Sequence, residues 1–348
     1  ITRTTATLSG IVTDSGGQSV TERGFYSSRT NPPTEESHKA RAGQGCGEFT
    51  ATYPNLKTNT TYYYMAYARN VNGTNFGEVK SFITKERAAS ISIVANSNLT
   101  MTSVMVKINL IPYSSTIKEA GICFNTNHNP TTANEKVISS NQIGESILSL
   151  NGLNNNTKYY LKAYVLTEED GTIYSPEDTI WTYALMDIDG NGYHAVTIGS
   201  QTWTVENLKV THYCNGDLIP EVKDSIEWYS YPEGALCYYN NDKAKYNSVY
   251  GALYNFNAVK DPRRLFPAGW HIPTNYEYAD LSRYLDGNAI TGGKMKEKGT
   301  KHWQAPNTGA SNSSGFTALP GGARARTFTY PTIVTFHNFG YLAYFWTS

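Results

Sequence analysis

The sequence predicts a mainly β protein in which two tandem β-sandwiches precede a C-terminal α+β domain. Three observations support this fold class. Tyr is unusually frequent, with 27 copies, and Tyr and Thr favour the pleated, half-buried surface of a sheet. A long segment of the N-terminal half recurs later in the chain at the spacing of one sandwich domain. The clearest helix signal follows Pro273, in the C-terminal part.

Length and charge set the broad class of the protein. The chain has 348 residues, which is enough for two or three domains. Its 29 Lys and Arg balance 29 Asp and Glu, so it lacks the basic field that nucleic-acid binding needs. No apolar run approaches the roughly 20 residues that span a bilayer. The chain begins abruptly at Ile1 in strand-like sequence, from which we expect the mature or trimmed end of an exported protein.

The internal repeat defines the first two domains. Gly24-Phe25-Tyr26 aligns with Gly121-Ile122-Cys123, and Leu56–Tyr67 aligns with Leu153–Tyr164, at an offset of 97 residues in both cases. This period matches one sandwich domain and is too long for a solenoid unit. We therefore expect sandwiches at residues 1–85 and 88–183, and a third domain at residues 186–348.

Strands within the repeats alternate with a period of two. The pattern predicts strands at Thr5–Thr13, Tyr62–Arg69, Val104–Leu110 and Tyr159–Thr167. Asn72-Gly73 and Asp170-Gly171 are typical of hairpin turns.

A repeated pattern, Leu-x-x-x-Thr-x-Tyr, resembles the tyrosine corner of fibronectin type III domains, which share the immunoglobulin-like sandwich. In those domains the Tyr hydroxyl bonds to the backbone at the corner between two strands. The matching positions here are Tyr62 and Tyr159. The resemblance implies modules that act as spacers or docking platforms, so we expect no active site in them.

The best-marked helix lies in the C-terminal domain. Thr274 and Glu277 have the spacing of a capping box. Leu281 and Leu285 continue one apolar face of the helix that follows. Gly287 stands where a left-handed residue would end this helix.

A second helix is predicted from Tyr250, Leu253, Tyr254 and Ala258, which fit one helical face, although Gly251 weakens this interpretation.

Ordered motifs in the C-terminal part resemble the family named for the Fibrobacter succinogenes major paralogous domain (FISUMP). The resemblance covers about Met186 to Ser348 and includes Asp187-Ile188-Asp189-Gly190-Asn191, Gln201-Thr202-Trp203, Glu206-Asn207-Leu208, Gly269-Trp270-His271 and Leu319-Pro320-Gly321-Gly322. It implies a C-type-lectin-like fold and a surface or secreted bacterial protein, often a lipoprotein. Members continue past the segment that ends here at Ser348, so we expect the domain to be truncated at its C-terminus.

Cysteines do not suggest a disulfide-dense scaffold. Cys46 and Cys123 fall in different predicted domains, so we expect them to be unpaired. Cys214 and Cys237 share a domain, and a disulfide between them is open to test.

A candidate cation site lies at Asp187, Asp189 and Asn191, where oxygen-bearing side chains alternate with spacers as in a calcium loop. The distal bidentate Glu of an EF-hand loop is missing. The alternative is a hairpin turn without metal. Calcium is the one cofactor that we consider.

Exposed aromatic residues are the candidates for ligand contact, because a flat π surface suits the apolar face of a sugar ring or a peptide side chain. Five of the six Trp lie in the C-terminal domain. The candidates in polar, turn-rich sequence are Trp228, Tyr229, Tyr231, His302 and Trp303. The alternative is packing beneath long loops.

The leading functional hypothesis is a non-catalytic cell-surface lipoprotein of the outer membrane. Its C-terminal domain would bind glycan, peptide or a surface protein, with the sandwiches as spacers. The sequence contains no His-Glu-x-x-His, Gly-x-Ser-x-Gly or Walker motif, so we expect no enzyme. The alternative is a structural or accessory subunit of a nutrient-uptake or adhesin assembly that binds no free ligand.

Overall fold

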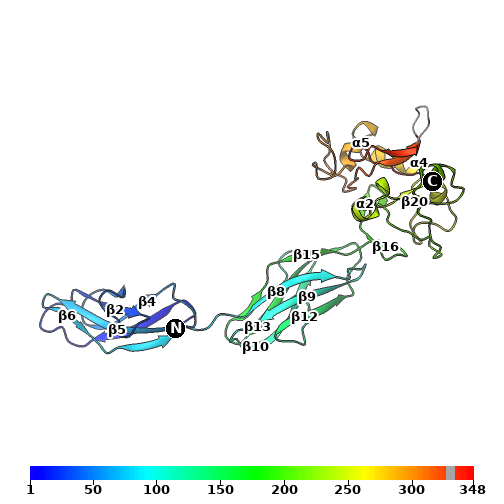
Figure 1. The fold of residues 1–348 in the computed structure, drawn as a ribbon. Coiled ribbons are helices and arrows are strands. Elements are labelled where there is room, and N and C mark those ends of the chain that lie inside the picture. The colour runs from blue at the N-terminus through cyan, green and yellow to red at the C-terminus, as the bar shows by residue number, and fades with distance from the viewer. Residues whose placement is uncertain (327–333) are drawn as a thin grey trace.

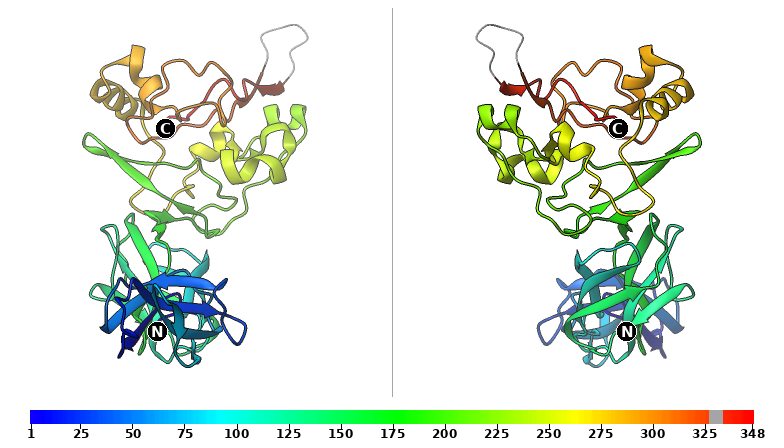
Figure 2. Two further views of the ribbon diagram at one scale, coloured as in Figure 1. Left: turned by 90° about the vertical axis from the view of Figure 1, so that its left-hand side faces the viewer. Right: turned by 90° about the vertical axis from the view of Figure 1, so that its right-hand side faces the viewer.

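Three bodies follow one another along the chain in the computed structural model, which describes residues 1–326 and 334–348 (Figure 1). Two elongated sandwiches lie end to end, and an irregular third body follows at the far end from the N-terminus. In the side views of Figure 2 the two sandwiches overlap beneath this third body, as end-to-end placement requires. Within the described residues, helices occur in the third body alone. The predicted fold class is confirmed.

The first sandwich packs a two-stranded sheet against a five-stranded one. The small sheet pairs β1 with β4, and the large sheet has the order β3-β2-β5-β6, with β7 also on β5. The strands are β1 (Ala6–Val12), β2 (Glu22–Ser28), β3 (His38–Arg41), β4 (Gly47–Tyr53), β5 (Thr61–Asn70), β6 (Gly73–Phe76) and β7 (Lys80–Ile83).

The second sandwich repeats this plan with one more strand in the small sheet. That sheet has the order β12-β9-β8, and the large sheet has β11-β10-β13-β14, with β15 also on β13. The strands are β8 (Ser90–Ser97), β9 (Ser103–Ile111), β10 (Ile117–Asn125), β11 (Glu135–Ile138), β12 (Gly144–Asn151), β13 (Lys158–Thr167), β14 (Gly171–Tyr174) and β15 (Asp178–Trp181). Two antiparallel sheets in this strand order form a fibronectin type III sandwich.

Alternation along the strands builds each sandwich core. In β9, Val104, Val106, Ile108 and Leu110 are buried, and the residues between them are exposed or partly exposed. A strand shows successive side chains to opposite faces, so these four residues share the inner face.

Both predicted tyrosine corners are present. The Tyr62 hydroxyl accepts a hydrogen bond from the Lys57 N–H at 3.0 Å, and the Tyr159 hydroxyl accepts one from the Asn154 N–H at 2.9 Å.

The C-terminal body consists of small ribbons and short helices joined by long irregular segments. Its described strands form four separate two-stranded ribbons, β16-β17, β18-β19, β20-β21 and β22-β23. The elements are β16 (Leu185–Met186), β17 (Gly192–Tyr193), β18 (Ala195–Ile198), β19 (Gln201–Thr204), α1 (Ser225–Ser230), β20 (Leu236–Cys237), the 3-10 turn η1 (Tyr239–Asn241), α2 (Lys243–Tyr250), β21 (Leu253–Tyr254), α3 (Phe256–Val259), α4 (Asn275–Tyr284), α5 (Asn288–Met295), β22 (Ala323–Arg326) and β23 (Val334–His337).

Helix α4 begins as predicted and ends differently. Thr274 is its N-cap, and the reciprocal capping box with Glu277 is present. The left-handed residue at the other end is Asp286, with φ 72°, and Gly287 caps the next helix instead. The Gly287 N–H reaches back to the Ser282 carbonyl, a closure that places the left-handed residue one position earlier.

The prediction of one continuous helix from Tyr250 through Ala258 is wrong. Helix α2 stops at Tyr250, and β21 separates it from α3. Gly251 has φ 73°, and a Cβ there would lie 2.4 Å from the Leu208 carbonyl oxygen. The chain therefore turns sharply at this glycine, where a continuous helix would not fit.

The four cysteines are free, which rules out the Cys214–Cys237 disulfide in this structure. The Cys214 thiol donates to the Phe266 carbonyl at 2.8 Å. Cys237 is buried in β20, and burial raises the pKa of its thiol to about 11. Each sulfur therefore has its own local environment.

The two junctions between the bodies differ. At the first, the Arg3 guanidinium donates to both carboxylate oxygens of Asp170. At the second, the His194 ring stacks on Trp181 at 4.0 Å between centroids. The Asn156 carboxamide there bonds to both backbone groups of Ala195.

Within the described ranges, no helix combines the length and apolar character needed to cross a membrane.

Candidate functional site

The C-terminal body has two hydrophobic clusters instead of one core. The Tyr254 cluster contains Val210, Tyr213, Ile219, Leu236, Tyr238, Tyr254, Ala258, Val259 and Leu265. The Trp203 cluster contains Ile198, Trp203, Leu281, Leu285, Met295, Phe316 and Ala318. A pocket of about 480 Å³ is lined by members of both clusters, so it lies where the two clusters meet. Its volume falls within the roughly 300–1,000 Å³ of ligand sites.

Aromatic side chains form much of the pocket wall. Trp203 packs against Tyr278 at 5.1 Å and against Phe316 at 5.8 Å between ring centroids. Phe345 and Trp346 line the pocket from the last residues of the chain and keep 39% and 46% of their surface exposed. This wall offers flat apolar surface that a ligand could cover.

Two polar atoms of the lining residues lack a partner within the described part of the chain. They are the Gln201 Oε1 and the Trp203 Nε1, and both atoms are buried. Trp203 as a whole is 7% exposed. A buried donor or acceptor without a partner is destabilising, so these two atoms carry a local energetic cost beside the pocket.

The capping box of α4 also lies at the pocket. The Glu277 Oε2 accepts from the Thr274 N–H at 2.7 Å, and its Oε1 contacts the His271 Nε2 at 2.8 Å. The hydrogen bond from Thr274 and the pairing with His271 together hold the pKa of Glu277 below its usual value, against a smaller opposing effect of burial. The carboxylate that begins the helix thereby also positions an exposed imidazole of the lining.

Glu206 connects the pocket to the second junction. It lines the pocket, and its carboxylate bonds to the His194 Nδ1 at 2.6 Å and to the His194 N–H at 2.7 Å. Burial acts to raise the pKa of Glu206, but the bonds to His194 outweigh it and the net pKa is lowered. For His194, burial acts to lower the pKa, and the bonds to Glu206 and to the Trp181 carbonyl reverse this effect.

The predicted aromatic residues near α1 lie together, outside the pocket lining. Trp228 and Tyr229 are in the helix, and Tyr231 follows it. The Arg324 guanidinium lies 4.9 Å from the centre of the Trp228 ring, and Arg326 lies 4.9 Å from the Tyr229 ring. Tyr229 remains 60% exposed. This group stays a candidate contact surface, although each of the two rings already has a guanidinium beside it.

Trp303 is not an exposed platform, which corrects the prediction for this residue. It is 6% exposed, and its indole N–H donates to the Ala318 carbonyl at 3.0 Å. Its neighbour His302 is partly buried, with its Nδ1 2.9 Å from both carboxylate oxygens of Glu297. Packing beneath a loop, the alternative from the sequence, describes both residues.

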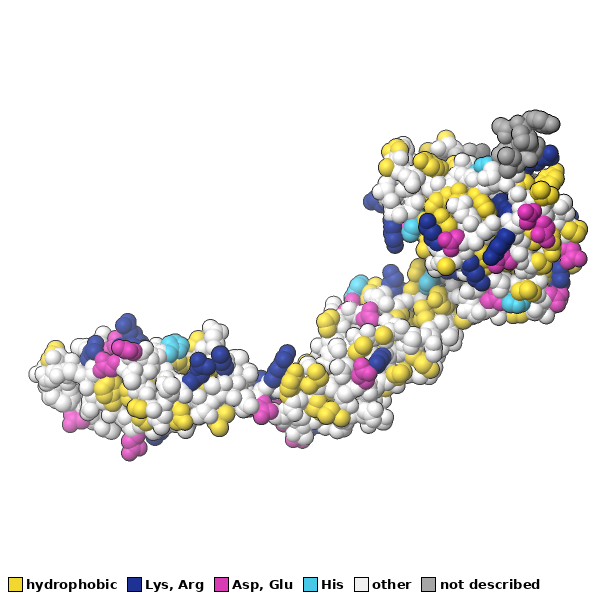
Figure 3. Space-filling model, in the orientation of Figure 1, with side chains coloured by type: hydrophobic (Ala, Val, Ile, Leu, Met, Phe, Trp, Pro, Cys, Tyr) yellow, Lys and Arg dark blue, Asp and Glu magenta, His cyan; other side chains and the backbone are white. Residues whose placement is uncertain are grey.

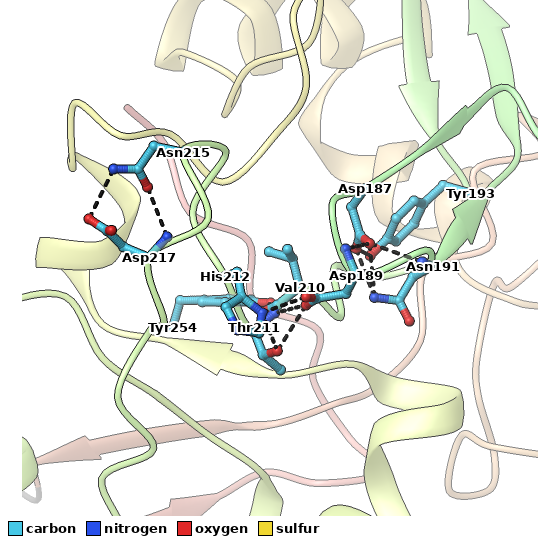
Figure 4. Close-up of polar contacts among 10 residues, drawn as sticks. All are labelled: Asp187, Asp189, Asn191, Tyr193, Val210, Thr211, His212, Asn215, Asp217 and Tyr254. Carbon is cyan, nitrogen blue, oxygen red and sulfur yellow. Dashed lines mark hydrogen bonds and ion pairs between the residues drawn. The ribbon is translucent and has the colours of Figure 1, made fainter.

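Asp187, Asp189 and Asn191 form a hydrogen-bonded turn (Figure 4). The Asp187 carboxylate accepts from the Asn191 N–H at 2.9 Å and from the Tyr193 hydroxyl at 2.6 Å. The Asp189 carboxylate faces another segment and contacts Thr211 and the His212 Nδ1. Within the described residues, no group of three or more His, Cys, Asp or Glu is placed to hold a metal. The geometry favours the turn, and calcium binding stays a prediction.

Sequence reasoning missed the pocket as a site, although it quoted several of its residues as family motifs. Gln201, Glu206 and His271 all line it. The available signal was the clustering of aromatic and polar residues within those motifs. Their spatial meeting depends on segments far apart in the chain, so no local pattern reveals it.

Residues 196–348 match the family described as Fibrobacter succinogenes major domain. The match lies in the C-terminal domain and covers less than half of the chain. The whole pocket lining, from Ser200 to Trp346, lies within these matched residues, below called the major domain. The turn at Asp187–Asn191 precedes the matched range.

Among solved structures, the FN1–FN3 domains of chicken CNTN1 match at 17% identity and a TM-score of 0.23. The match covers 46% of this chain and 53% of that one, so the chain spans about half of the length of that structure. The strand order described above, and not this match, identifies the sandwiches. No curated protein matches the chain.

Proposed function

We propose that this chain is a non-catalytic binding protein of the bacterial cell surface. The major domain binds its ligand in the pocket between the Tyr254 and Trp203 clusters. The two sandwiches act as spacers that hold it away from the outer membrane, to which a lipid anchor attaches the exported chain. The family and the tandem sandwiches form the domain architecture of a surface protein, and the anchor and the outer membrane are parts of the proposal.

The observation that carries this proposal is the pocket itself. It combines exposed aromatic surface at Phe345 and Trp346 with the exposed imidazole of His271. Apolar walls with a few placed polar groups are typical of ligand sites. A glycan or a peptide would supply both kinds of contact. The charges in view on the surface are of mixed sign (Figure 3), so no single-sign field favours a polyanion.

A glycan and peptide array probed with the whole chain tests the proposal. The pocket variant combines Trp346→Ala with His271→Ala, and the matched control combines Trp228→Ala with Tyr229→Ala at α1. We expect the pocket variant to lose binding by about tenfold or more while the α1 variant keeps it. The opposite result would move the site to α1. Trp303→Ala is unsuitable, because Trp303 is buried and its loss would damage the fold.

A structural or accessory role in a nutrient-uptake or adhesin assembly is the second candidate. Large apolar side chains exposed on the helices favour it, with Ile226 79% exposed on α1 and Tyr276 85% exposed on α4. Exposed apolar surface often marks a protein interface. No binding to any array member, together with a stable membrane partner that Ile226→Ser releases, would support this role over ligand binding.

A further inference from the structure

The β18-β19 hairpin has one covered edge and one uncovered edge. Its register pairs Ile198 with Gln201 and Val196 with Trp203. The Val205 N–H bonds to the His194 carbonyl at 2.9 Å, which continues the same series of hydrogen-bonded pairs. Because such pairs alternate with non-bonded ones, the N–H and C=O groups of Thr202 and Thr204 point away from β18.

The edge of β18 is covered by the second sandwich. The Ala195 N–H donates to the Asn156 Oδ1 at 3.0 Å, and the Asn156 Nδ2 donates to the Ala195 carbonyl at 2.9 Å. One carboxamide thus makes the two bonds that a neighbouring strand would make. This edge is closed to a further strand at Ala195.

The edge of β19 opens on the pocket. Thr202, Trp203 and Thr204 all line it. The backbone N–H and C=O groups of Thr202 and Thr204 have no partner among the residues that the structure describes. An unpaired strand edge is a template for another extended chain, and here it borders an apolar cavity.

Backbone carbonyl groups elsewhere in the pocket lining already accept hydrogen bonds. The last residue, Ser348, donates from its N–H to the Pro273 carbonyl at 3.0 Å and from its hydroxyl to the Ile272 carbonyl at 3.0 Å. Trp346 anchors this segment through its Nε1, which donates to the Tyr254 carbonyl at 2.8 Å. Backbone carbonyl groups of lining residues therefore accept hydrogen bonds from another segment of the chain.

We infer that the pocket takes an extended peptide, which pairs with β19 as an added strand. This inference rests on the proposed function and names its ligand class. The peptide backbone bonds to Thr202 and Thr204, and alternate apolar side chains enter between the two hydrophobic clusters, since strand residues alternate in direction. A glycan offers hydroxyl groups but no series of N–H and C=O groups at the strand repeat of about 3.3 Å. The geometry at β19 therefore favours a peptide.

Labelled peptides of roughly eight residues, with Val, Leu, Phe or Tyr at alternate positions, are the probes. Each peptide is made in three forms. One is unmodified, and the other two carry N-methyl groups on the backbone N–H groups of one edge or of the opposite edge of the extended peptide. Fluorescence anisotropy with the whole chain should show saturable binding of the unmodified form. One methylated form should lose about tenfold or more in affinity, and the other should bind normally. Equal binding of all three forms, or binding of no peptide, overturns the inference.

The matched protein variants are Thr202→Pro and Thr197→Pro. These residues are partners in the hairpin, and each substitution removes an N–H that points outward. Thr202→Pro removes it at the pocket and should abolish peptide binding, whereas Thr197→Pro removes it on the other edge and should not. Circular dichroism checks that both variants fold. If Thr202→Pro fails to fold, the binding of the N-methylated peptides to the wild-type chain still tests the inference.

The arms separate failure of this inference from failure of the proposed function. If a glycan binds the chain, Trp346→Ala abolishes that binding and no peptide binds, the peptide inference is wrong and the pocket remains the ligand site. No pocket-dependent ligand of either class overturns both. If the chain self-associates and Thr202→Pro abolishes this self-association, the β19 edge pairs with a second copy of the chain. The inference of a separate peptide partner is then wrong.

Discussion

Single residues hold the corners and turns of this protein. The tyrosine corners use one hydroxyl each to satisfy a backbone N–H that would otherwise lack a partner at the corner. The Asp187 carboxylate does the same for a turn, where it accepts from the backbone of Asp189 and Asn191. In both cases one polar side chain replaces a missing ladder bond, so removal of that group should affect stability more than its size suggests.

Tyr159→Phe should lower the free energy of unfolding by about 1–3 kcal/mol, because it leaves the Asn154 N–H without its acceptor. Chemical denaturation of the whole chain, followed through the second sandwich, measures this. The control is Tyr160→Phe, because the hydroxyl of the half-buried Tyr160 makes no hydrogen bond within the described residues. Equal losses for the two variants would contradict a specific role of the corner.

The calcium prediction is tested by thermal melting with a chelator and with added calcium. The Asp187 carboxylate already accepts hydrogen bonds from the turn and from Tyr193, so we expect the same melting temperature in both conditions. A ligand that binds the native state must raise stability. If calcium raises the melting temperature and Asp187→Ala removes this rise, the predicted cation site is therefore supported.

At the scale of elements, glycines decide where helices and ribbons change direction. Gly251 ends α2 with a positive φ, and a Cβ there would lie 2.4 Å from the Leu208 carbonyl oxygen, so a side chain has no room. Gly292, inside α5, has a helical conformation, and a Cβ there would meet nothing within 4 Å. A side chain is therefore excluded at Gly251 but has room at Gly292 in the same domain.

Gly251→Ala should therefore destabilise the major domain by more than about 1 kcal/mol, through both backbone strain and the clash. Gly292→Ala should be neutral or stabilise by up to about 1 kcal/mol, because Ala favours the helix. Differential scanning calorimetry of both variants compares them directly. A loss at Gly292 as large as that at Gly251 would show that helix α5 packs differently.

At the scale of the whole molecule, the second junction should depend on pH. His194 has a raised pKa, so its contribution is complete below its ordinary value of 6.5 and is lost as the pH rises through the folded value. Glu206 has a lowered pKa, so its contribution is present above its ordinary value of 4.5 and is lost as the pH falls through the folded value. The pair therefore contributes most between these two ordinary values.

Thermal melting at about pH 5.5 and about pH 8.5 tests this prediction. The wild-type chain should lose stability in the major domain or its junction at the higher pH. His194→Gln should flatten that difference, since Gln keeps the polar contact without the titrating group. An unchanged pH dependence in the variant would assign the effect to other groups.

The sandwiches were predictable because their information is local and repeated. The period of two along β9 and the two copies of the tyrosine corner need no distant partner to be recognised. The major domain differs, because β20 and β21 have two residues each and pair across a helix. Trp303 stands in polar sequence and Trp346 follows an apolar, aromatic run, yet only Trp303 is buried. Whether each Trp is buried depends on contacts with segments far away in the sequence, which a short stretch of sequence does not include. The pocket depends on such distant segments as well.

The unlike junctions also have a mechanical consequence. The first depends on the Arg3–Asp170 ion pair, whose side chains are 26% and 19% exposed, and dissolved ions screen such a pair. The second combines stacked rings and a two-point amide contact with the His194–Glu206 pair, whose side chains are 15% and 29% exposed, and salt screens a partly buried pair less. In brackish surroundings the first joint loosens before the second. The second sandwich and the major domain should then move together as one unit, so the volume that the major domain explores should widen as the salt concentration rises.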